Sequence, residues 1–372
     1  MTPTVRLHQQ PDRVDWIRQV ADQQGSRVGL SGLLGDLDAV ARVGPVPVST
    51  ARYGFSWAAA DGVDQEWWPQ GITTSADARD SGEEFGRSVV VVGWYAKKLA
   101  GTPSHGSRVS VVDVTDEDSP RYRHVRLVQP RLDEKSGVVG LEPVRVHAGG
   151  IGWYGSSLLV ADTHGGIRVF GWDDVLRLDG DPHDGCRYVL PQRTSFRAVA
   201  DEGTSPFRFS FLSVDRSQPD HRLVMGEYGA EGQTRRLASC SLDPTADGSL
   251  ADGAALELRE GLPHSQGVLR IGDSWYVSTS RGRFRRGGMR ELEESGGWRE
   301  HAASLAVGCE DLAYWPQRDE IWSCSEYPGH RFVYAMPRSN FSSARLARLR
   351  SRLKALWPPA PLVGLSQPSG RR

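Results

Sequence analysis

Hydrophobic and polar residues follow two different patterns along the chain. A predicted helix begins after Asp12, where a capping side chain is favoured. Its apolar face contains Val14, Ile17, Val20 and Ala21, spaced three and four residues apart. A second short helix is predicted from Leu33 to Val43. From about residue 48, short runs rich in Val, Ile, Trp and Tyr alternate with clusters of Gly, Pro, Asp and Ser, which is typical of strands and turns. These patterns predict a helical N-terminal extension over residues 1–47 and an all-β region after it.

The strand pattern repeats weakly five times. The repeats begin near residues 70, 147, 209, 266 and 310. Each has a short strand, a turn with Gly or Asp, and a second strand that ends in small polar residues. Four strands in roughly 40–50 residues are typical of one β-propeller blade. Two stacked sandwiches would not explain the recurring first strand, so we predict a β-propeller over residues 48–340. Five blades are expected, and a sixth blade made with residues 48–60 is the alternative.

Residues 341–372 are predicted to form an appendage. A helix is expected over 342–356, with Leu346, Leu349, Leu353 and Leu356 on one face and basic residues around it. Such a helix can bind an anionic membrane surface, here through 342–357, or a partner. We favour packing of its leucines on the rest of the chain. Residues 342–372 carry seven basic and no acidic side chains, so the net charge of −1 divides into +7 there and −8 before it.

Composition excludes several classes of protein. The chain is 38% hydrophobic and has no long apolar run, which argues against disorder and against a membrane span. Its near-zero net charge does not favour nucleic acid as a partner. The N-terminus does not resemble a secretory signal, so a cytoplasmic location is expected. The chain is also expected to be a monomer. None of the four cysteines stands in a C-x-x-C spacing, and we expect them to be buried apolar residues.

Two of the repeats resemble blades of known propellers. The segments are HAGGIGWYGSSLLVADTHGGIRVF, from His147, and CEDLAYWPQRDEIWSCSEYPGHRFVY, from Cys309. They resemble blades of uncharacterised actinobacterial proteins and, more distantly, of strictosidine-synthase-like and gluconolactonase-like propellers. The resemblance covers most of residues 66–336 and rests on the blade pattern, not on an active-site motif. It implies the fold more than an activity, and it points to specialised metabolism.

Residues before each first strand should surround one mouth of the central channel. Two positions upstream of the aligned strands stand Gln70, Gly149, Phe209, Gln266 and Glu310, and four positions upstream stand Trp68, His147, Phe207, His264 and Gly308. Two imidazoles and a carboxylate can hold a divalent metal such as Zn²⁺, or act as acid and base. His147, His264 and Glu310 are therefore candidate catalytic residues and candidate metal ligands. Gln70 and Gln266 would bind substrate. The alternative is that these side chains only satisfy backbone groups.

A second column lies where the second strands end. It contains Trp94, Thr163, Glu227, Ser280 and Glu326, followed by Tyr95, His164, Tyr228, Arg281 and Tyr327. We predict substrate contacts from Trp94, Tyr95, Glu227, Arg281 and Glu326. Glycoside cleavage needs two carboxylates, which Glu227, Glu310, Glu326 and Asp162 could supply. The alternative for Glu227 and Glu326 is a turn role in a recurring Glu-Tyr pattern. Arg281 opens the run RGRFRRGGMR, whose arginines could bind an anionic group or stay solvated.

These residues lead to one main hypothesis and two alternatives. The main hypothesis is a cytoplasmic enzyme that acts on a small molecule at the channel mouth, as a metal- or His-assisted lyase, cyclase or hydrolase. The first alternative is a non-catalytic binding or scaffold propeller, and the second is a glycosidase. The glycines at 150, 152 and 155 match a dinucleotide-binding spacing, but the segment after them is a strand and not the required helix. A divalent metal is the only cofactor that the pattern indicates.

Overall fold

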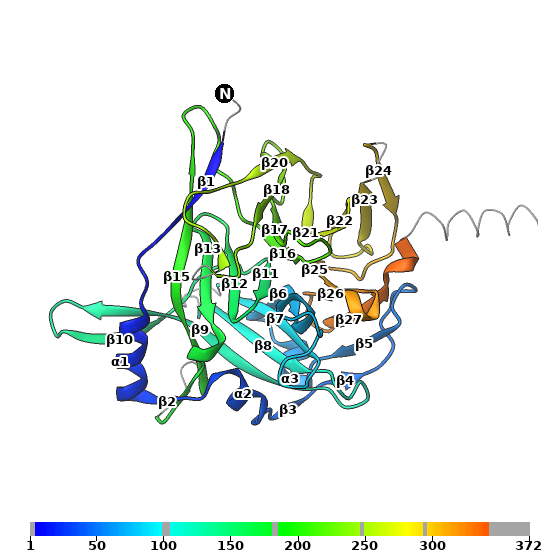
Figure 1. The fold of residues 1–372 in the computed structure, drawn as a ribbon. Helices are drawn as coiled ribbons and strands as arrows, with labels where there is room; N and C mark the ends of the chain where they lie inside the picture. The colour runs from blue at the N-terminus through cyan, green and yellow to red at the C-terminus, as the bar shows by residue number, and fades with distance from the viewer. Residues whose placement is uncertain (1–3, 99–104, 181–184, 246–248, 293–295, 342–372) are drawn as a thin grey trace, which may run out of the picture.

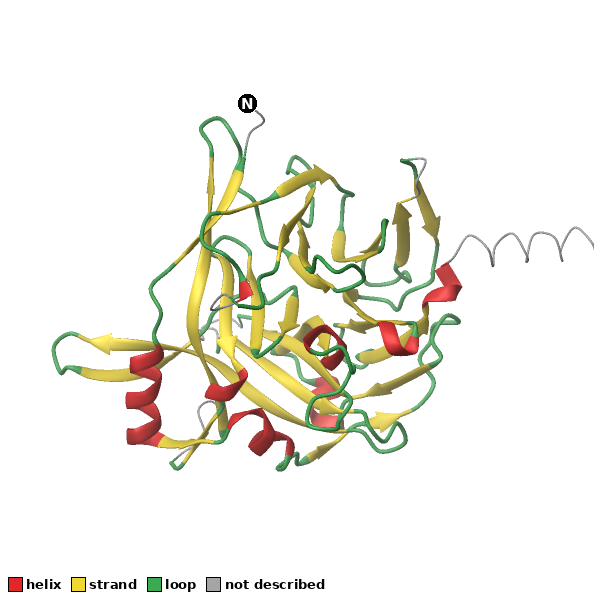
Figure 2. Cartoon of the chain, viewed as in Figure 1, coloured by secondary structure: helices red, strands yellow, loops and turns green. Residues whose placement is uncertain are grey.

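Five four-stranded antiparallel sheets surround a central axis, so the protein is an all-β propeller, as predicted (Figure 1). The computed structural model describes residues 4–98, 105–180, 185–245, 249–292 and 296–341. Strands are the main secondary structure, and the helices are few and short (Figure 2).

Each blade follows the previous one along the chain. Blade 1 contains β6 (Trp67–Thr74), β7 (Val89–Ala96), β8 (Ser107–Asp113) and β9 (Arg121–Asp133). Blade 2 contains β11 (Ile151–Tyr154), β12 (Ser157–Asp162), β13 (Gly166–Gly171) and β15 (Tyr188–Ala200). Blade 3 contains β16 (Phe211–Asp215), β17 (Arg222–Gly226), β18 (Arg236–Ser241) and β20 (Glu257–Glu260). Blade 4 contains β21 (Ser265–Ile271), β22 (Ser274–Thr279), β23 (Gly288–Leu292) and β24 (Trp298–His301).

Blade 5 joins the last strands of the described chain to a strand that precedes blade 1. It contains β25 (Cys309–Trp315), β26 (Glu320–Ser325), β27 (Phe332–Pro337) and β5 (Tyr53–Ser56), so its fourth strand comes from before blade 1. The segment that could have made a sixth blade therefore completes the fifth. No sixth blade is present among the described residues, and the alternative blade number is wrong.

The first strand of each blade lines the axis. β6, β11, β16, β21 and β25 contact one another in this order, and β25 contacts β6 to close the ring. Asp311 in β25 is fully buried, and its Oδ2 accepts N–H bonds from Ile72 at 3.3 Å and from Ile151 at 3.4 Å. The starts of these strands form one mouth of the channel. The short helix α4 (Ser75–Ala78) follows β6 and packs on β11 and β25 at the other end.

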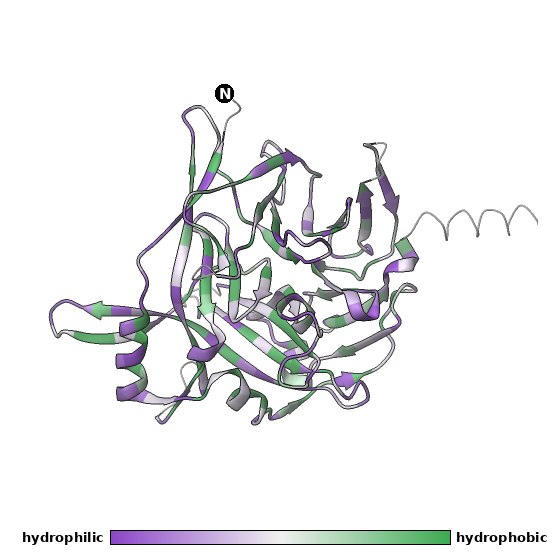
Figure 3. Ribbon diagram, viewed as in Figure 1, coloured by the Kyte–Doolittle hydropathy of each residue, from purple (hydrophilic) through white to green (hydrophobic). Residues whose placement is uncertain are grey.

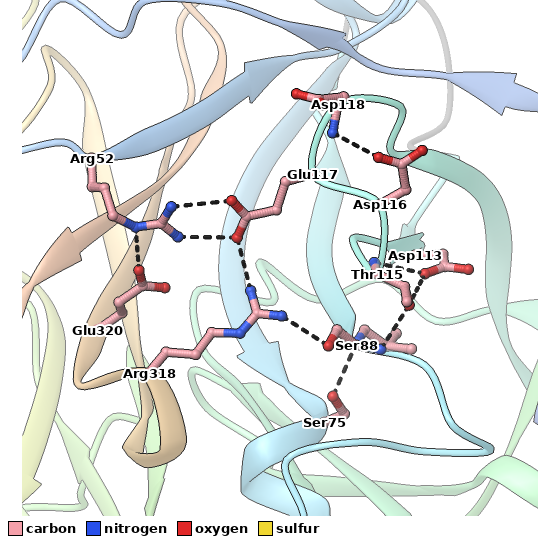
Figure 4. A network of polar contacts seen from close by, with 11 residues as sticks. Arg52, Ser75, Ser88, Asp113, Thr115, Asp116, Glu117, Asp118, Arg318 and Glu320 are labelled. Carbon is pink, nitrogen blue, oxygen red and sulfur yellow. Dashed lines mark hydrogen bonds and ion pairs between the residues drawn. The ribbon is translucent and has the colours of Figure 1, made fainter.

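A polar network also closes the ring between blades 5 and 1 (Figure 4). Glu117, in the turn between β8 and β9, accepts hydrogen bonds from Arg52 at 3.0 and 3.1 Å and from Arg318 at 3.1 Å. Arg52 also pairs with Glu320, and Arg318 donates to Ser88 Oγ at 2.9 Å. Arg318 lies between two strands of blade 5, and Arg52 lies just before β5 of the same blade. One carboxylate of blade 1 therefore contacts both arginines.

The apolar side chains lie mainly on the strands, whereas α1 (Val14–Gln24) is mostly hydrophilic (Figure 3). In β7 the run Val89–Val92 is fully buried, because neighbouring blades cover both faces of the sheet. All four cysteines are buried and free, as predicted. Within the described ranges, no helix is long and apolar enough to cross a membrane. A cytoplasmic location stays a prediction.

The N-terminal segment is only partly as predicted. Helix α1 is present and buries Ile17, Val20 and Ala21. The second helix, α2 (Gly29–Leu34), ends where the predicted one was expected to begin. Short strands follow it, β3 (Ala39–Val40) on β9 and β4 (Arg42–Val43) on β5. Strand β1 (Val5–Gln9) pairs with β15. Pairing with propeller strands therefore overrides the helical pattern.

The remaining elements are short connections or outer strands. They are β2 (Gly25–Arg27), α3 (Ala59–Val63), β10 (Val138–Pro143), β14 (Leu176–Leu178), β19 (Ala254–Ala255) and the 3-10 helices η1 (Trp172–Asp174), η3 (Pro316–Arg318) and η4 (Arg338–Phe341). The predicted helix over 342–356 lies outside the described residues. Of the predicted appendage over 341–372, only Phe341 is described.

Candidate functional site

A cavity of about 390 Å³, lined mostly by residues with polar side chains, lies at the mouth of the channel where the inner strands begin. It is lined by Gln70, His147, Gly149, Thr163, His164, Arg208, Ser210, Tyr228, Gln233, Gln266, Glu310 and Glu326. A second hollow of about 630 Å³ shares Tyr228, Gln266 and Glu326 with it and extends to His264 and Arg281. The structure therefore brings members of both predicted columns together at one mouth.

Two carboxyl groups face this cavity, and an amide from another blade contacts each of them. Glu310, at the start of β25, is 1% exposed, and its Oε1 accepts a hydrogen bond from Gln266 Nε2 at 3.2 Å. Glu326, just after β26, accepts one at Oε2 from Gln70 Nε2 at 3.1 Å. Gln70 lies in β6 and Gln266 in β21, so blades 1, 4 and 5 together position the two carboxyl groups.

The surroundings of the two carboxyl groups differ. Burial raises the pKa of Glu310 well above its usual value, and the charges of Glu326 and Asp311 raise it further. Burial also raises the pKa of Glu326, but hydrogen bonds from Gln70 and Tyr327 and the charges of Lys97 and Arg331 act against this. As a coupled pair, the two groups do not ionise together. We assign the retained proton to Glu310 and the first negative charge to Glu326.

His147 lies at the rim of the cavity. Its ring packs on that of Tyr95, with centroids 4.4 Å apart. The protein around the ring lowers the pKa of His147 to about 4. The lowered pKa keeps the ring mainly uncharged at pH 7. His147 can therefore donate or accept a hydrogen bond with a ligand at neutral pH, but it is not a protonated general acid.

His264 lies in the second hollow and not in the same cavity as His147. It is exposed, and its Nδ1 lies 3.2 Å from the hydroxyl of Tyr228. Its backbone has a φ of 58°, a conformation that Ala148 adopts in blade 2 with a φ of 51°. The structural counterpart of His264 is therefore Ala148. The alignment that paired the two histidines is wrong by one residue in blade 2.

The predicted metal ligands do not assemble. Among the residues that the structure describes, no three His, Cys, Asp or Glu side chains lie close enough together to hold a metal ion. His147 and Glu310 line the channel-mouth cavity, whereas His264 lines the second hollow. Glu310 Oε1 contacts a Gln amide, and His264 Nδ1 contacts a Tyr hydroxyl. The prediction of a shared divalent-metal site is thus not supported by the geometry.

Two residues of the second column lie away from the cavity. The side chain of Glu227 is fully buried, and Arg236 pairs with it at 2.8 Å while the backbone N–H of Arg208 donates to it at 3.2 Å. The indole of Trp94 is buried in the core and donates to Ser110 Oγ at 2.7 Å. The ion pair with Arg236 occupies Glu227, and packing in the core occupies Trp94. We therefore correct the prediction that they contact substrate: both side chains have structural roles.

Arg281, also predicted to contact substrate, lines the outer hollow and pairs with Glu300. The neighbouring Arg283 stacks over the ring of Tyr327 at 5.3 Å. The run of arginines therefore forms one edge of the mouth, farther out than the two carboxyl groups.

A buried Ser–His–Asp arrangement lies in blade 1, outside the mouth. Ser110 Oγ is 2.8 Å from His124 Nδ1, and His124 Nε2 is 3.0 Å from Asp61 Oδ1. Ser110 is fully buried and accepts the Trp94 hydrogen bond, so no substrate can reach its hydroxyl. The arrangement resembles a catalytic triad in composition only, and we assign it to the stability of blade 1.

Sequence reasoning missed several lining residues. Arg208, Ser210 and Gln233 line the cavity but were not among the candidates. Arg208 stands one position before Phe209 in the first column. Because Phe209 is buried in the core, its polar neighbour takes the position at the mouth. Thr163, His164 and Tyr228 belong to the second column and could have been selected on the same grounds as Glu326.

Comparisons with known proteins add little to this geometry. No family profile matches the chain, and no curated protein matches it. Among solved structures, the GH43_1 enzyme from Xanthomonas citri complexed with xylose aligns with a TM-score of 0.36 and 9% identity, over 75% of this chain and 90% of that one. The subtype N11 neuraminidase-like protein of A/flat-faced bat/Peru/033/2010 aligns with a TM-score of 0.30 and 9% identity, over 71% and 61%.

A third match is CoXyl43, a GH43 β-xylosidase/α-arabinofuranosidase from a compost microbial metagenome, with a TM-score of 0.32 and 10% identity, over 74% of this chain and 93% of that one. Matches this distant do not indicate an activity for this chain. None of these three is a strictosidine-synthase-like or gluconolactonase-like protein, so that resemblance stays a prediction.

Proposed function

We propose that the channel mouth is the active site of a hydrolase that cleaves small glycosides with Glu310 as the acid and Glu326 as the carboxylate. The observation that carries the proposal is this pair of carboxyl groups, which line one cavity and differ in burial and in charged surroundings. Glycoside cleavage requires one protonated and one ionised carboxyl group. The earlier hypothesis of metal- or His-assisted chemistry is thereby replaced by chemistry of the two glutamates.

The other lining groups fit a ligand rich in hydroxyls. Gln70 and Gln266 have amide groups, and Tyr228, Thr163 and Ser210 have hydroxyls, all of which can donate and accept hydrogen bonds. The cavity volume of about 390 Å³ is within the usual range for small-molecule sites. In the proposed reaction, Glu310 protonates the leaving oxygen as the glycosidic bond breaks. Glu326 either activates the water that attacks the anomeric carbon, or attacks that carbon itself to form a glycosyl-enzyme, which water then hydrolyses with the ionised Glu310 as base.

The experiment uses the full chain and a panel of 4-nitrophenyl and 2,4-dinitrophenyl glycosides. We expect Glu310→Gln to lower kcat by about 100-fold or more for the 4-nitrophenyl substrates, because the proton donor is lost. The dinitrophenyl substrates need little protonation of the leaving group, so this variant should retain most activity on them. Glu326→Gln should be inactive on both kinds of substrate. Glu260→Gln, an exposed glutamate of β20, is the matched control and should behave as the wild type.

Two results would contradict the proposal. Absence of turnover by the wild type across the panel would reject the glycosidase. If calorimetry then showed saturable sugar binding that Gln70→Ala abolishes, the non-catalytic binding propeller would replace it. Equal activity of Glu310→Gln and the wild type on 4-nitrophenyl substrates would remove Glu310 from the chemistry.

A further inference from the structure

A separate polar hollow of about 300 Å³ lies on the outer part of blade 2. The connection between β1 and α1, strand β9, the turn between β12 and β13, and strand β15 all contribute to it. It shares no lining residue with the channel-mouth cavity. Its charged lining consists of Arg13, Arg131, Arg168, Arg197 and a single carboxylate, Asp162. Four guanidinium groups therefore converge on a space with one acidic side chain.

The positive charge in this hollow is not fully balanced. Arg168 pairs with Asp162 at 2.8 Å, and Arg131 pairs with the exposed Glu142 at 3.0 Å. Within the described parts of the chain, no carboxylate pairs with Arg13 or Arg197. Burial lowers the pKa of Arg13, and the charges of Arg168 and Arg131 lower it further, so the guanidinium lies among like charges. Two positive charges remain without a counterpart.

Two buried donor atoms of residues that line this hollow lack acceptors. Gln192 is 1% exposed, and its Oε1 accepts a hydrogen bond from Arg168 Nη1 at 2.7 Å. That bond fixes the orientation of the amide, and its Nε2 has no hydrogen-bond partner within the described structure. The same holds for Arg13 Nη1. Buried donors without acceptors are uncommon in folded proteins, and a bound ion or ligand beside them is one explanation for their presence.

We propose that this hollow binds a phosphate group, either as inorganic phosphate or on a phosphorylated small molecule. A phosphate supplies between one and two negative charges at neutral pH and several acceptor oxygens, which match the two arginines without a carboxylate partner. Planar guanidinium groups bind such oxygens in pairs. The hollow is larger than a phosphate ion needs, so a small organic part fits beside it. This site is independent of the proposed hydrolase.

Calorimetric titration of the full chain with inorganic phosphate and with glycerol 3-phosphate tests the site, at constant ionic strength set by sodium chloride. The wild type should bind saturably. Arg13→Gln and Arg197→Gln should each raise the Kd by at least about tenfold, because each removes a charge-assisted hydrogen bond. Arg18→Gln is the matched control, since Arg18 lies in α1, close to Arg13 in sequence, but is exposed and pairs with Asp15. Far-ultraviolet circular dichroism checks that each variant is folded.

Tighter binding of glycerol 3-phosphate than of phosphate would support a phosphorylated molecule as the ligand, and equal binding would support the free ion. Absence of saturable binding of both compounds by the wild type would overturn the proposal. So would wild-type affinity in both Arg13→Gln and Arg197→Gln. Glycosidase activity is measured separately, so either proposal can fail while the other stands.

Discussion

At the scale of single residues, the His124 network makes stability depend on pH. Burial and the charge of Arg108 lower the pKa of His124 to about 4, although Asp61 acts against this. In the unfolded chain its pKa is about 6.5. As pH falls below 6.5, the unfolded state binds a proton that the folded state does not, so the folded state loses stability. We expect this residue to contribute a loss of roughly 1–3 kcal/mol between pH 7.5 and pH 4.5.

The measurement is urea unfolding of the wild type and of His124→Gln at several pH values. The glutamine keeps a polar side chain near Ser110 and Asp61 but does not titrate. The wild type should therefore lose more stability on acidification than the variant does. Identical pH profiles for the two proteins would show that His124 does not cause the change. Groups elsewhere, such as the buried Glu310, titrate in both proteins and cancel in the difference.

The position of the candidate site could be predicted from single residues because blades repeat. Glu310, Gln266 and Gln70 each stand two positions before the aligned apolar residue of an inner strand, and all three line the cavity. Glu227 and Glu326 stand at equivalent places after a second strand, but only Glu326 lines it. Arg236, in the neighbouring strand β18, pairs with Glu227. An alignment of the repeats contains no information on such a partner.

At the scale of elements, the close approach of inner strands depends on glycine. A Cβ on Gly150 would lie 2.0 Å from the backbone nitrogen of Leu212, in the next blade. No side-chain rotation can relieve this contact, because the atom that it meets belongs to the backbone. Gly150→Ala should therefore lower the free energy of unfolding by about 3 kcal/mol or more.

The control for this prediction is Gly140→Ala in β10, where an added Cβ meets nothing within 4 Å. We expect that variant to unfold within about 0.5 kcal/mol of the wild type in urea. If Gly150→Ala were as stable as Gly140→Ala, the inner strands would have to separate easily, and the axis would not be tightly packed.

Elements with strong local patterns could be predicted, and elements that depend on distant partners could not. The apolar run of β7 indicates a strand covered on both faces, and α1 follows its three-and-four spacing. Strand β5 is different, because it pairs with β27, and Phe55 lies opposite Val333. Nothing local distinguishes such a strand from the start of a further blade. Residues 39–40 and 42–43, inside the predicted second helix, likewise form short strands because β9 and β5 offer edges to pair with.

At the scale of the whole molecule, the ring places two polar hollows in different environments. The channel mouth contains two carboxyl groups, Glu310 and Glu326, and the hollow of blade 2 contains a cluster of arginines. The net charge of −8 on residues 1–341 therefore conceals a local excess of positive charge on blade 2. A total for the chain does not describe the field that a small anionic ligand meets.

Closure of this ring should depend on Glu117, which joins Arg52 and Arg318 of the last blade to the first (Figure 4). Glu117→Gln leaves two arginines with a neutral partner and should lower stability by about 1 kcal/mol, or Tm by about 2 °C. Asp118→Asn, at the exposed neighbouring position, is the control and should leave Tm unchanged.

The pH dependence identifies the cause. Hydrogen bonds from Arg52 lower the pKa of Glu117 in the folded protein, so its contribution is present above about pH 4.5 and is lost as the pH falls. The difference in Tm between the wild type and Glu117→Gln should therefore shrink at pH 4 and in 1 M sodium chloride, which screens exposed ion pairs. A difference that stayed constant under both conditions would mean that packing, and not the charge of Glu117, joins the first and last blades.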